Sequence, residues 1–350
     1  MERRINHVLI TGVTGFLGGH LAARLRGMGV RVRGVGRDAA RGEVLRERLG
    51  VDFVRMDLGT PEEDEDAARL CGNVDTVFHA GALSSPWGKK SDFEKANVQA
   101  TRRVIRAARR AGVERLVHVS TPSLYFRHGG GTNVREDAPL PPPVNDYVRT
   151  KRLAEGLVRE AGSDGWETVT IRPRALIGAG DPSILPRLIR ALEKGRLPVI
   201  GNGDNLTDLT CVENAVDALI LAATVSGERV AGKVYNITNG EPVKLWEILA
   251  RMAGMLDLPP PGRHVPARLV QGVAGILEGW GRLRGKEPSL TRYGVGVLSE
   301  TQTLDISAAR RDLGYAPELT VSLGLDRFVS WWRSGAPYPF WTAPDGGAGT

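Results

Sequence analysis

The sequence is poor in cysteine and in long apolar runs. Its two cysteines among 350 residues, Cys71 and Cys211, form neither a metal-ligand spacing nor a disulfide framework. We interpret both as small buried residues of a protein from a reducing compartment. No apolar run reaches the ~20 residues that span a bilayer, and no signal peptide precedes the first apolar segment. We therefore expect a cytoplasmic protein with no metal ion and no transmembrane span.

Lysine is also scarce, because 8 lysines leave 39 arginines among the 47 basic residues. The net charge of +7 is of a kind that attracts nucleic acid, anionic lipid or anionic small molecules. The densest arginine run, at residues 102–110, recurs at helical spacing and is typical of a solvated helix face. It comes without a zinc-finger spacing or an RNA-binding signature, so we predict no nucleic-acid partner.

Short apolar runs alternate with helical patterns through the first half of the chain. The predicted strands are 7–10, 30–35, 51–56, 76–79, 116–119 and 168–171. The predicted helices between them are 16–26, 61–70, 93–111 and 146–161. This alternation predicts an α/β protein with a Rossmann-type, doubly wound parallel sheet. In such sheets ligands bind outside the carboxyl ends of the strands.

The pattern loosens after Arg172, where proline and glycine become frequent over residues 173–204. Later helices are predicted at 213–224, 245–255, 267–283 and 322–332. We predict a dinucleotide-binding domain over 1–172, a smaller substrate-binding region over 173–335 with segments that return to the sheet, and a tail over 336–350.

The first predicted strand ends in a glycine-rich turn with the spacing G-x-x-G-x-x-G. Glycine permits a tight turn and lets backbone amides approach a pyrophosphate, whose charge the following helix N-terminus stabilises. Because the turn stands between a strand and an amphipathic helix, we predict a dinucleotide site there. Its predicted binding residues are Gly12, Thr14, Gly15, Phe16, Leu17 and Gly18.

The end of the second strand bears on the choice of cofactor. An NAD enzyme usually has an acid there that accepts from the ribose 2′-hydroxyl. Here Gly36 takes that position and Arg37 follows, and a guanidinium suits a 2′-phosphate in charge and geometry. We therefore predict a preference for NADP(H). NAD(H) stays possible, because a small shift of the loop brings Asp38 to the position of the acid.

The third and fourth strands end in further candidate cofactor contacts. Asp57 either contacts the adenine amine or caps a helix, and Leu58 follows it. The small residues after the fourth strand allow the dinucleotide to lie against the backbone; they are Ala80, Gly81 and Ala82. We interpret His79 as a structural histidine with satisfied hydrogen bonds.

Tyr147 and Lys151 form the predicted catalytic pair. Their i, i+4 spacing puts both side chains on one face of the helix after the fifth strand. A free tyrosine has a pKa of ~10, and a nearby ammonium is expected to lower it. Tyr147 then donates a proton to a carbonyl oxygen during reduction, or acts as the base in the reverse direction.

A hydroxyl at the end of the fifth strand is predicted to bind the substrate carbonyl. Thr121 is our first choice, Ser123 the second and Ser120 the third, and Ser120 is also predicted to touch the cofactor. At least two of the three are expected to cap their own loop. Together these residues predict hydride transfer to a ketone, with the hydride chemistry supplied by the cofactor.

These motifs resemble the extended short-chain dehydrogenase/reductase family, and the resemblance covers nearly the whole chain. It implies that Asn97 shapes the cofactor pocket, that Pro173 lies near the nicotinamide, and that the protein is a homodimer through the helices 93–111 and 146–161. The matching motifs, in the family's order, are Thr11-Gly12-x-x-Gly15-Phe16-x-Gly18, Asp57-Leu58, His79-Ala80-x-Ala82, Asn97-Val98-x-Ala100-Thr101, Tyr147-x-x-x-Lys151 and Arg172-Pro173.

Within the family, several segments look like the branch of 3β-hydroxysteroid dehydrogenases and 2-alkyl-3-oxoalkanoate reductases; one of them is Leu290-Thr291-Arg292-Tyr293. The resemblance implies a small substrate that is apolar or bears an acyl chain. Nucleotide-sugar epimerases and dehydratases usually carry an arginine where this chain has Thr207-Asp208-Leu209. A catalytically silent NADP(H) sensor is a further alternative. The apolar pattern of residues 263–284 fits core packing or a lid that touches a membrane surface.

Overall fold

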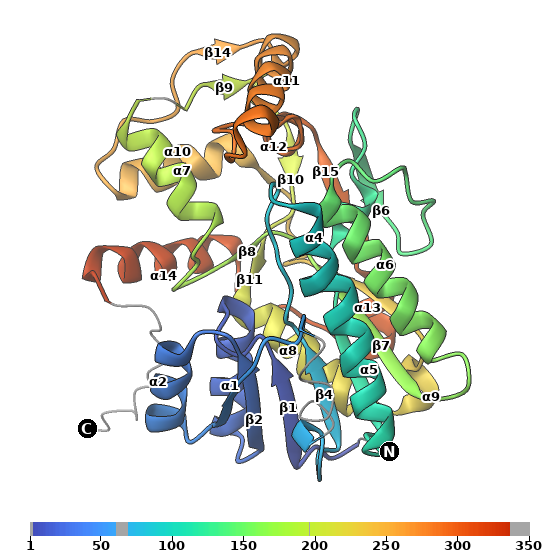
Figure 1. Cartoon of the computed structure of the whole chain (residues 1–350). Coiled ribbons are helices and arrows are strands. Elements are labelled where there is room, and N and C mark those ends of the chain that lie inside the picture. Colours follow the sequence, from blue (N-terminus) through green and yellow to red (C-terminus); the bar gives the residue numbers. More distant parts are fainter. Residues whose placement is uncertain (1–2, 61–68, 196, 337–350) are drawn as a thin grey trace, which may run out of the picture.

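A seven-stranded parallel sheet forms the centre of the computed structural model, which describes residues 3–60, 69–195 and 197–336 (Figure 1). The strand order is β12-β7-β5-β4-β1-β2-β3. The chain therefore winds outward from β1 to β3 and then crosses to β4 on the other side of β1, as predicted for a doubly wound fold. The strands are β1 (His7–Thr11), β2 (Arg31–Gly36), β3 (Asp52–Arg55), β4 (Thr76–His79), β5 (Arg115–Val119), β7 (Glu167–Pro173) and β12 (Val234–Ile237).

Helices cover both faces of this sheet. The helices of this part are α1 (Phe16–Gly27), α2 (Ala39–Leu49), α4 (Lys90–Phe93), the π-helical turn η2 (Glu94–Gln99), α5 (Ala100–Arg110), the 3-10 turn η3 (Pro122–Tyr125), α6 (Asp146–Ala161), α8 (Val212–Thr224), α9 (Gly227–Val230) and α13 (Ser307–Leu313). Apolar side chains of α1, α8 and α13 pack on one face, and those of α5 and α6 pack on the other. The layers bury the near-continuous apolar strands that parallel sheets require.

The helix expected at 93–111 differs from the prediction, because a π-helical turn interrupts it. Thr101 Oγ1 donates to the carbonyl of Asn97 at 2.6 Å within this segment. A π turn inserts one extra residue and changes the direction of the side chains that follow. The helix expected at 61–70 falls mainly on residues 61–68, which lie outside the described residues.

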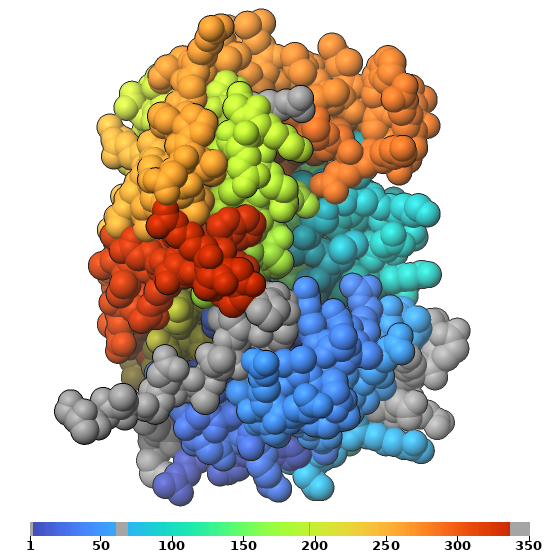
Figure 2. Space-filling model, turned by 90° about the vertical axis from the view of Figure 1, so that its left-hand side faces the viewer, coloured from blue at the N-terminus to red at the C-terminus, as the bar shows by residue number. Residues whose placement is uncertain are grey.

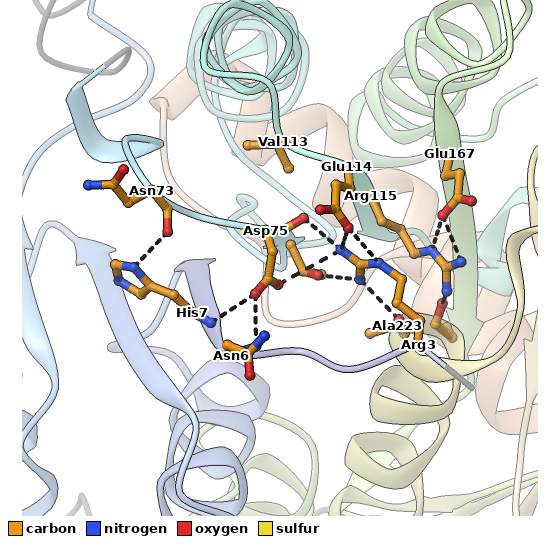
Figure 3. Close-up of polar contacts among 12 residues, drawn as sticks. Arg3, Asn6, His7, Asn73, Asp75, Val113, Glu114, Arg115, Glu167 and Ala223 are labelled. Atoms are coloured by element: carbon orange, nitrogen blue, oxygen red, sulfur yellow. Dashed lines mark hydrogen bonds and ion pairs between the residues drawn. The ribbon is translucent and has the colours of Figure 1, made fainter. Parts of the chain in front are cut away.

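Polar side chains connect the strands at the amino-terminal edge of the sheet (Figure 3). The Arg3 guanidinium donates to the Asp75 carbonyl at 2.9 Å and to the Glu114 carboxylate at 2.8 Å. The Asp75 carboxylate accepts from the backbone amides of Asn6 and His7. Because ligands of doubly wound sheets bind at the opposite edge, we assign this network to the stability of the fold.

The second half of the chain builds a smaller region above the sheet and returns one strand, β12, to it (Figures 1 and 2). A four-stranded sheet with the order β13-β10-β15-β6 lies in this region. Its elements are β6 (Gly131–Val134), β8 (Leu176–Ile177), α7 (Ile184–Glu193), β9 (Val199–Ile200), β10 (Leu206–Thr207), β11 (Thr210–Cys211), β13 (Val243–Lys244), α10 (Leu245–Met255), β14 (His264–Val265), α11 (Ala267–Arg284), α12 (Arg292–Ser299), β15 (Gln302–Leu304) and α14 (Val321–Ser334). Helices close to α10, α11 and α14 are predicted from the sequence, whereas α7, α12 and the short strands are not. Residues 337–350 of the predicted tail lie outside the described residues.

Candidate active site

The turn after β1 is packed backbone against backbone. Gly12 has a φ of +69°, and a Cβ on it would lie 2.7 Å from the Cα of Gly81 in the segment after β4. A Cβ on Gly18 would lie 2.3 Å from the carbonyl oxygen of Gly12. The two segments meet where the strand order reverses between β1 and β4, which is where doubly wound folds bind their ligand.

The first turn of α1 suits an anionic group. Gly15 is the N-cap residue and has no side chain to cap the helix, and the first turn contains no acidic residue. The backbone amides there and the helix dipole are therefore suited to a pyrophosphate. The Leu17 side chain is buried in the core and Phe16 packs beside it, so these two residues contribute only backbone atoms to that site. The residues present fit a dinucleotide.

At the end of β2, close packing against Thr14 limits which side chains fit at position 36. A Cβ on Gly36 would lie 2.6 Å from Thr14 Oγ1, so an acid there requires Thr14 to move. The Asp38 side chain caps α2 by accepting from the amide of Arg41 at 3.0 Å. Arg37 is exposed, and its guanidinium lies 3.9 Å from the Asp57 carboxylate.

Arg41 is a second basic group beside the glycine-rich turn. Its guanidinium donates to the Thr14 carbonyl at 3.4 Å. Arg41 is not predicted as a cofactor contact, because it lies in the first turn of α2, beyond the end of the strand where such contacts are expected. The Asp57 carboxylate accepts from the amide of Gly59 at 2.9 Å, and Leu58 packs on the core beneath α5. The Asp57 side chain therefore binds the backbone of its own loop and lies near Arg37. Its alternative role as a helix cap concerns the helix predicted over 61–70, most of which lies outside the described residues.

His79 bridges two strands and a helix, which confirms its interpretation as a structural residue. Its ring nitrogens contact Thr11 Oγ1 at 2.7 Å and Thr101 Oγ1 at 2.8 Å. Because Thr101 donates its own proton to Asn97, it accepts from Nε2 of His79, which fixes the neutral tautomer with Nδ1 as acceptor. Burial lowers the pKa of His79 to about 3. Thr11 Oγ1 also accepts from the amide of Gly81, so the network holds the segment after β4 in place.

Asn97 lies in the π turn and acts on the same segment. Its Oδ1 accepts from the amide of Leu83 at 2.7 Å, and its Nδ2 donates to Thr150 Oγ1 on α6 at 3.0 Å. The side chain therefore fastens the segment that contains Ala80, Gly81 and Ala82 to the helix of the predicted catalytic pair. This geometry agrees with a role in shaping the pocket rather than in touching a ligand.

Tyr147 and Lys151 both lie on α6, which begins at the N-cap Asn145. The Tyr147 hydroxyl lies near the side-chain hydroxyls of Thr121 and Ser84, which act on its pKa as hydrogen-bonding groups. Lys151 is buried, and its Nζ donates to the Val119 carbonyl at 2.6 Å. The pair, the end of β5 and the segment after β4 thus meet at the carboxyl edge of the sheet.

The pKa of Tyr147 differs from the expectation. Burial raises the pKa of its phenol, and the hydrogen bonds with Thr121 and Ser84 oppose this rise only in part. The predicted lowering by Lys151 is wrong, because the lysine ammonium is directed to the Val119 carbonyl. A raised pKa keeps the phenol protonated and so able to donate at neutral pH, but it also makes the phenol a weaker acid than one whose pKa lies near the working pH.

The three predicted hydroxyls, those of Thr121, Ser123 and Ser120, make different contacts. Thr121 caps its own loop by accepting from the amide of Ser123, and its hydroxyl donates to Ser123 Oγ at 3.0 Å. Ser123 Oγ lies 2.8 Å from the hydroxyl of Tyr293 on α12. Ser120 Oγ is buried without a hydrogen-bond partner among the described residues. The expectation that at least two of them cap their own loop is therefore wrong, because only Thr121 does so.

A chain of hydroxyl groups thus runs from Tyr147 through Thr121 and Ser123 to Tyr293. Sequence reasoning assigns no role to Ser84 or Tyr293. Ser84 follows the small residues after β4. Tyr293 ends the segment Leu290-Thr291-Arg292-Tyr293, which served only to indicate the branch of the family. Tyr293 comes from a helix far along the chain, and only the tertiary structure brings it to the site.

The end of β7 is held by an ion pair. The Arg172 guanidinium binds the Glu155 carboxylate of α6 and contacts the Tyr125 hydroxyl, which donates to Asn236 on β12 at 3.0 Å. Pro173 follows as the buried last residue of the strand. In the second region, Thr207 and Leu209 are buried side chains without charge.

Comparisons with known proteins identify relatives of the whole chain. Residues 8–238 match the model of the NAD dependent epimerase/dehydratase family. The chain is 33% identical to the 2-alkyl-3-oxoalkanoate reductase of Shewanella oneidensis, over 93% of this chain and 86% of that protein. It is 31% identical to the sterol-4-alpha-carboxylate 3-dehydrogenase, decarboxylating, of Mus musculus, over 91% and 89%. Among solved structures it is similar to MoeE5 in complex with UDP-glucose and NAD, with a TM-score of 0.73 and 30% identity over 94% of this chain and 99% of that one.

Proposed function

This chain belongs to the NAD-dependent epimerase/dehydratase family and is an NAD(P)-dependent oxidoreductase, and we propose that it uses NADPH to reduce the keto group of a 3-oxo acid with an alkyl chain. The observation that carries the proposal is the Tyr147 hydroxyl, held by Thr121 and Ser84 at the carboxyl edge of the sheet. The nicotinamide supplies the hydride when the cofactor is bound.

The side chains of this site are suited to the proton step. The phenol of Tyr147 stays protonated at neutral pH and gives its proton to the developing alkoxide oxygen. Thr121 orients that oxygen, and Ser84 is placed to do the same. The hydroxyls of Ser123 and Tyr293 extend from Thr121 and provide a route by which Tyr147 regains its proton.

The preference for NADPH is supported by the end of β2. An acid at Gly36 requires Thr14 to move, and Asp38 is engaged at the N-cap of α2. Arg37, with Arg41 beside it, offers positive charge to a 2′-phosphate. A charge-assisted hydrogen bond to phosphate is short and strong, and its geometry favours arginine.

Arg37→Ser is expected to weaken NADPH binding by about 10–100-fold, because a hydrogen bond to a charged group contributes ~1.5–3 kcal/mol. The affinity for NADH should stay unchanged. Fluorescence titration of both reduced cofactors measures the effect. Arg48→Ser, an equal change of charge at an exposed position of α2, is the matched control. Equal losses for NADPH and NADH would count against Arg37 as the phosphate contact.

The apolar substrate is supported by the second region. Where nucleotide-sugar enzymes usually carry an arginine for the substrate diphosphate, Thr207 and Leu209 are buried and uncharged. Next to the hydroxyl chain, the ring of the buried Phe126 packs against Tyr293 with centroids 4.9 Å apart. The Shewanella oneidensis relative is named for 2-alkyl-3-oxoalkanoates. A 3β-hydroxysteroid activity is the second candidate, favoured by the sterol dehydrogenase relative.

The deciding experiment follows the absorbance of NADPH, and then of NADH, with a 2-alkyl-3-oxo acid, a 3-oxosteroid and an aromatic ketone. Oxidation of NADPH with the oxo acid is the expected result. Turnover of the steroid alone would move the assignment to the second candidate, and turnover with NADH alone would overturn the cofactor preference. Bound cofactor with no turnover would favour a nucleotide-sugar enzyme or a sensor, which UDP-glucose as a further substrate distinguishes.

We propose that the Lys151 ammonium binds the nicotinamide ribose when the cofactor is present, and a limb in the pH profile is therefore expected from this residue. Burial lowers the pKa of its ammonium to about 8, while the nearby Glu155 carboxylate raises it in part. The cation is therefore present below pH 8 and lost above it, so kcat/KM for reduction should be level at lower pH and fall above about pH 8. Lys151→Arg, which keeps its charge at every pH of the assay, should remove this limb. A limb that stays unmoved in the variant would assign it to another group.

We also propose that residues 1–172, with β12 and other returning segments, hold the cofactor and that residues 173–335 hold the substrate. A homodimer through α5 and α6 is proposed with them, and Leu153 on α6 is an exposed apolar residue that such an interface would cover. Sedimentation equilibrium of the wild type and of Leu153→Glu tests the dimer.

A further inference from the structure

An apolar stripe runs along the outer face of α11. It consists of Leu269, Val273, Ile276, Trp280 and Leu283, whose exposed fractions range from 53% for Val273 to 88% for Leu283. The spacing of four and three residues places all five on one face of the helix. A neighbouring face, with Val270, Ala274 and Gly281, is buried against the rest of the region. Core packing therefore accounts for only one face of this segment.

Basic side chains border the stripe. Arg268 and Arg284 lie on its two sides at helical spacing, and Arg282 and Lys286 are exposed nearby. The Arg284 guanidinium lies over the Trp280 ring, 4.7 Å from its centroid. Within the helix the single acidic residue is Glu278, whose carboxylate accepts from the amide of Arg292 at 2.8 Å. The face is thus apolar along its middle and positive along its edges.

The helix lies at the end of the molecule opposite the seven-stranded sheet (Figure 1). It packs on α12, which carries Tyr293 of the hydroxyl chain, and a Cβ on Gly281 would lie 3.2 Å from the ring of Trp87 in the segment after β4. The stripe is therefore on the outer surface of the same region that approaches the active site. Among the described residues, no helix is both long and apolar enough to cross a membrane.

We propose that this face of α11 docks on the surface of an anionic lipid bilayer. The five apolar side chains enter the boundary between head groups and acyl chains, and the arginines bind lipid phosphates. Apolar patches of this kind with a polar rim mark interaction surfaces. Charge complementarity favours lipid over a second copy of the chain, because pairing two such faces brings arginines of like sign together. The inference is independent of the substrate proposed above.

The test is flotation of the full chain with vesicles of phosphatidylcholine alone and of phosphatidylcholine with one quarter phosphatidylglycerol, in about 0.1 M salt. The wild type should float with the anionic vesicles and bind the neutral ones at least about fivefold more weakly, since each basic side chain near an anionic surface contributes about that factor. The double variant Ile276→Asp/Trp280→Asp should lose flotation at least about tenfold. Leu323→Asp places a similar charge at an exposed apolar position of α14 and should float as the wild type does.

Thermal unfolding and turnover of a short ketone test whether the double variant keeps its fold and its activity. The double variant should show the thermal unfolding of the wild type and equal turnover of a short, water-soluble ketone, because both side chains are exposed and neither belongs to the hydroxyl chain of the site. A wild-type chain that stays unbound on anionic vesicles, or a double variant that still floats, would overturn the proposal. A loss of self-association in the double variant without vesicle binding by the wild type would also overturn it and assign the face to a contact between copies.

Discussion

Tyr147→Phe is expected to lower kcat for ketone reduction by about 10²–10⁴-fold, the usual contribution of a positioned general acid. The variant removes the phenolic proton but keeps the ring, so the packing of α6 is retained. Thr121 and Ser84 lose one hydrogen-bond partner but stay in place. The affinity for NADPH should not change, because no contact to the glycine-rich turn is lost. Steady-state turnover and fluorescence titration of NADPH measure the two quantities separately.

Tyr293→Phe is the matched control for this variant. It removes one hydroxyl at the other end of the same chain, where Tyr293 is bonded to Ser123 at 2.8 Å. Its loss of kcat should not exceed about tenfold, the equivalent of one neutral hydrogen bond of ~0.5–1.5 kcal/mol. Equal losses in both variants would show that the chain acts as a unit rather than through Tyr147. Tyr147→Phe with most of its activity retained would refute the assignment of the proton donor.

Gly18→Ala is expected to abolish NADPH binding at ordinary concentrations and to destabilise the fold by about 1–3 kcal/mol, as overpacking does. The added Cβ would lie 2.3 Å from the carbonyl oxygen and 2.9 Å from the carbonyl carbon of Gly12. Gly12 has no room to move, because its own α-carbon faces Gly81 across the turn. The turn that presents amides to the pyrophosphate must therefore change shape. Urea unfolding and NADPH titration measure the two effects.

Gly27→Ala tests whether the effect belongs to the turn or to helix α1 as a whole. A Cβ at Gly27, the last residue of α1, meets no atom within 4 Å. Because alanine favours helix over glycine by about 0.5–1 kcal/mol, this variant should be as stable as the wild type or slightly more stable. Normal NADPH affinity and stability in Gly18→Ala would contradict the close-packed turn.

The sequence signals that mark the candidate site are local. The glycines at 12, 15 and 18 restrict the backbone of one short turn, and Tyr147 and Lys151 share one helix face by spacing alone. The predicted parallel sheet is confirmed, and its topology brings the ends of β1, β4 and β5 together. Such features follow from residues that are close in the chain.

The partners of those residues could not be predicted, because they depend on side-chain direction and on contacts between distant segments. Lys151 shows this most clearly: its position is fixed by sequence, but its ammonium is directed to the Val119 carbonyl rather than to Tyr147. The pKa of Tyr147 is raised because the phenol is buried, and the spacing of residues in the sequence does not predict that burial. The π turn around Asn97 likewise lies in a segment that the sequence predicts as regular helix.

By itself, then, the sequence determines the fold class, the family, the glycine-rich turn and the placement of Tyr147 and Lys151 on one helix face, since each is encoded over a few neighbouring residues. Tertiary structure alone decides that Gly36 faces Thr14, that Ser84 and Tyr293 belong to the site, and which face of α11 is exposed. These facts depend on how segments pack in three dimensions. An amphipathic pattern gives the apolar face of a helix but not what covers it, and only the folded chain shows that the stripe from Leu269 to Leu283 is left on the surface.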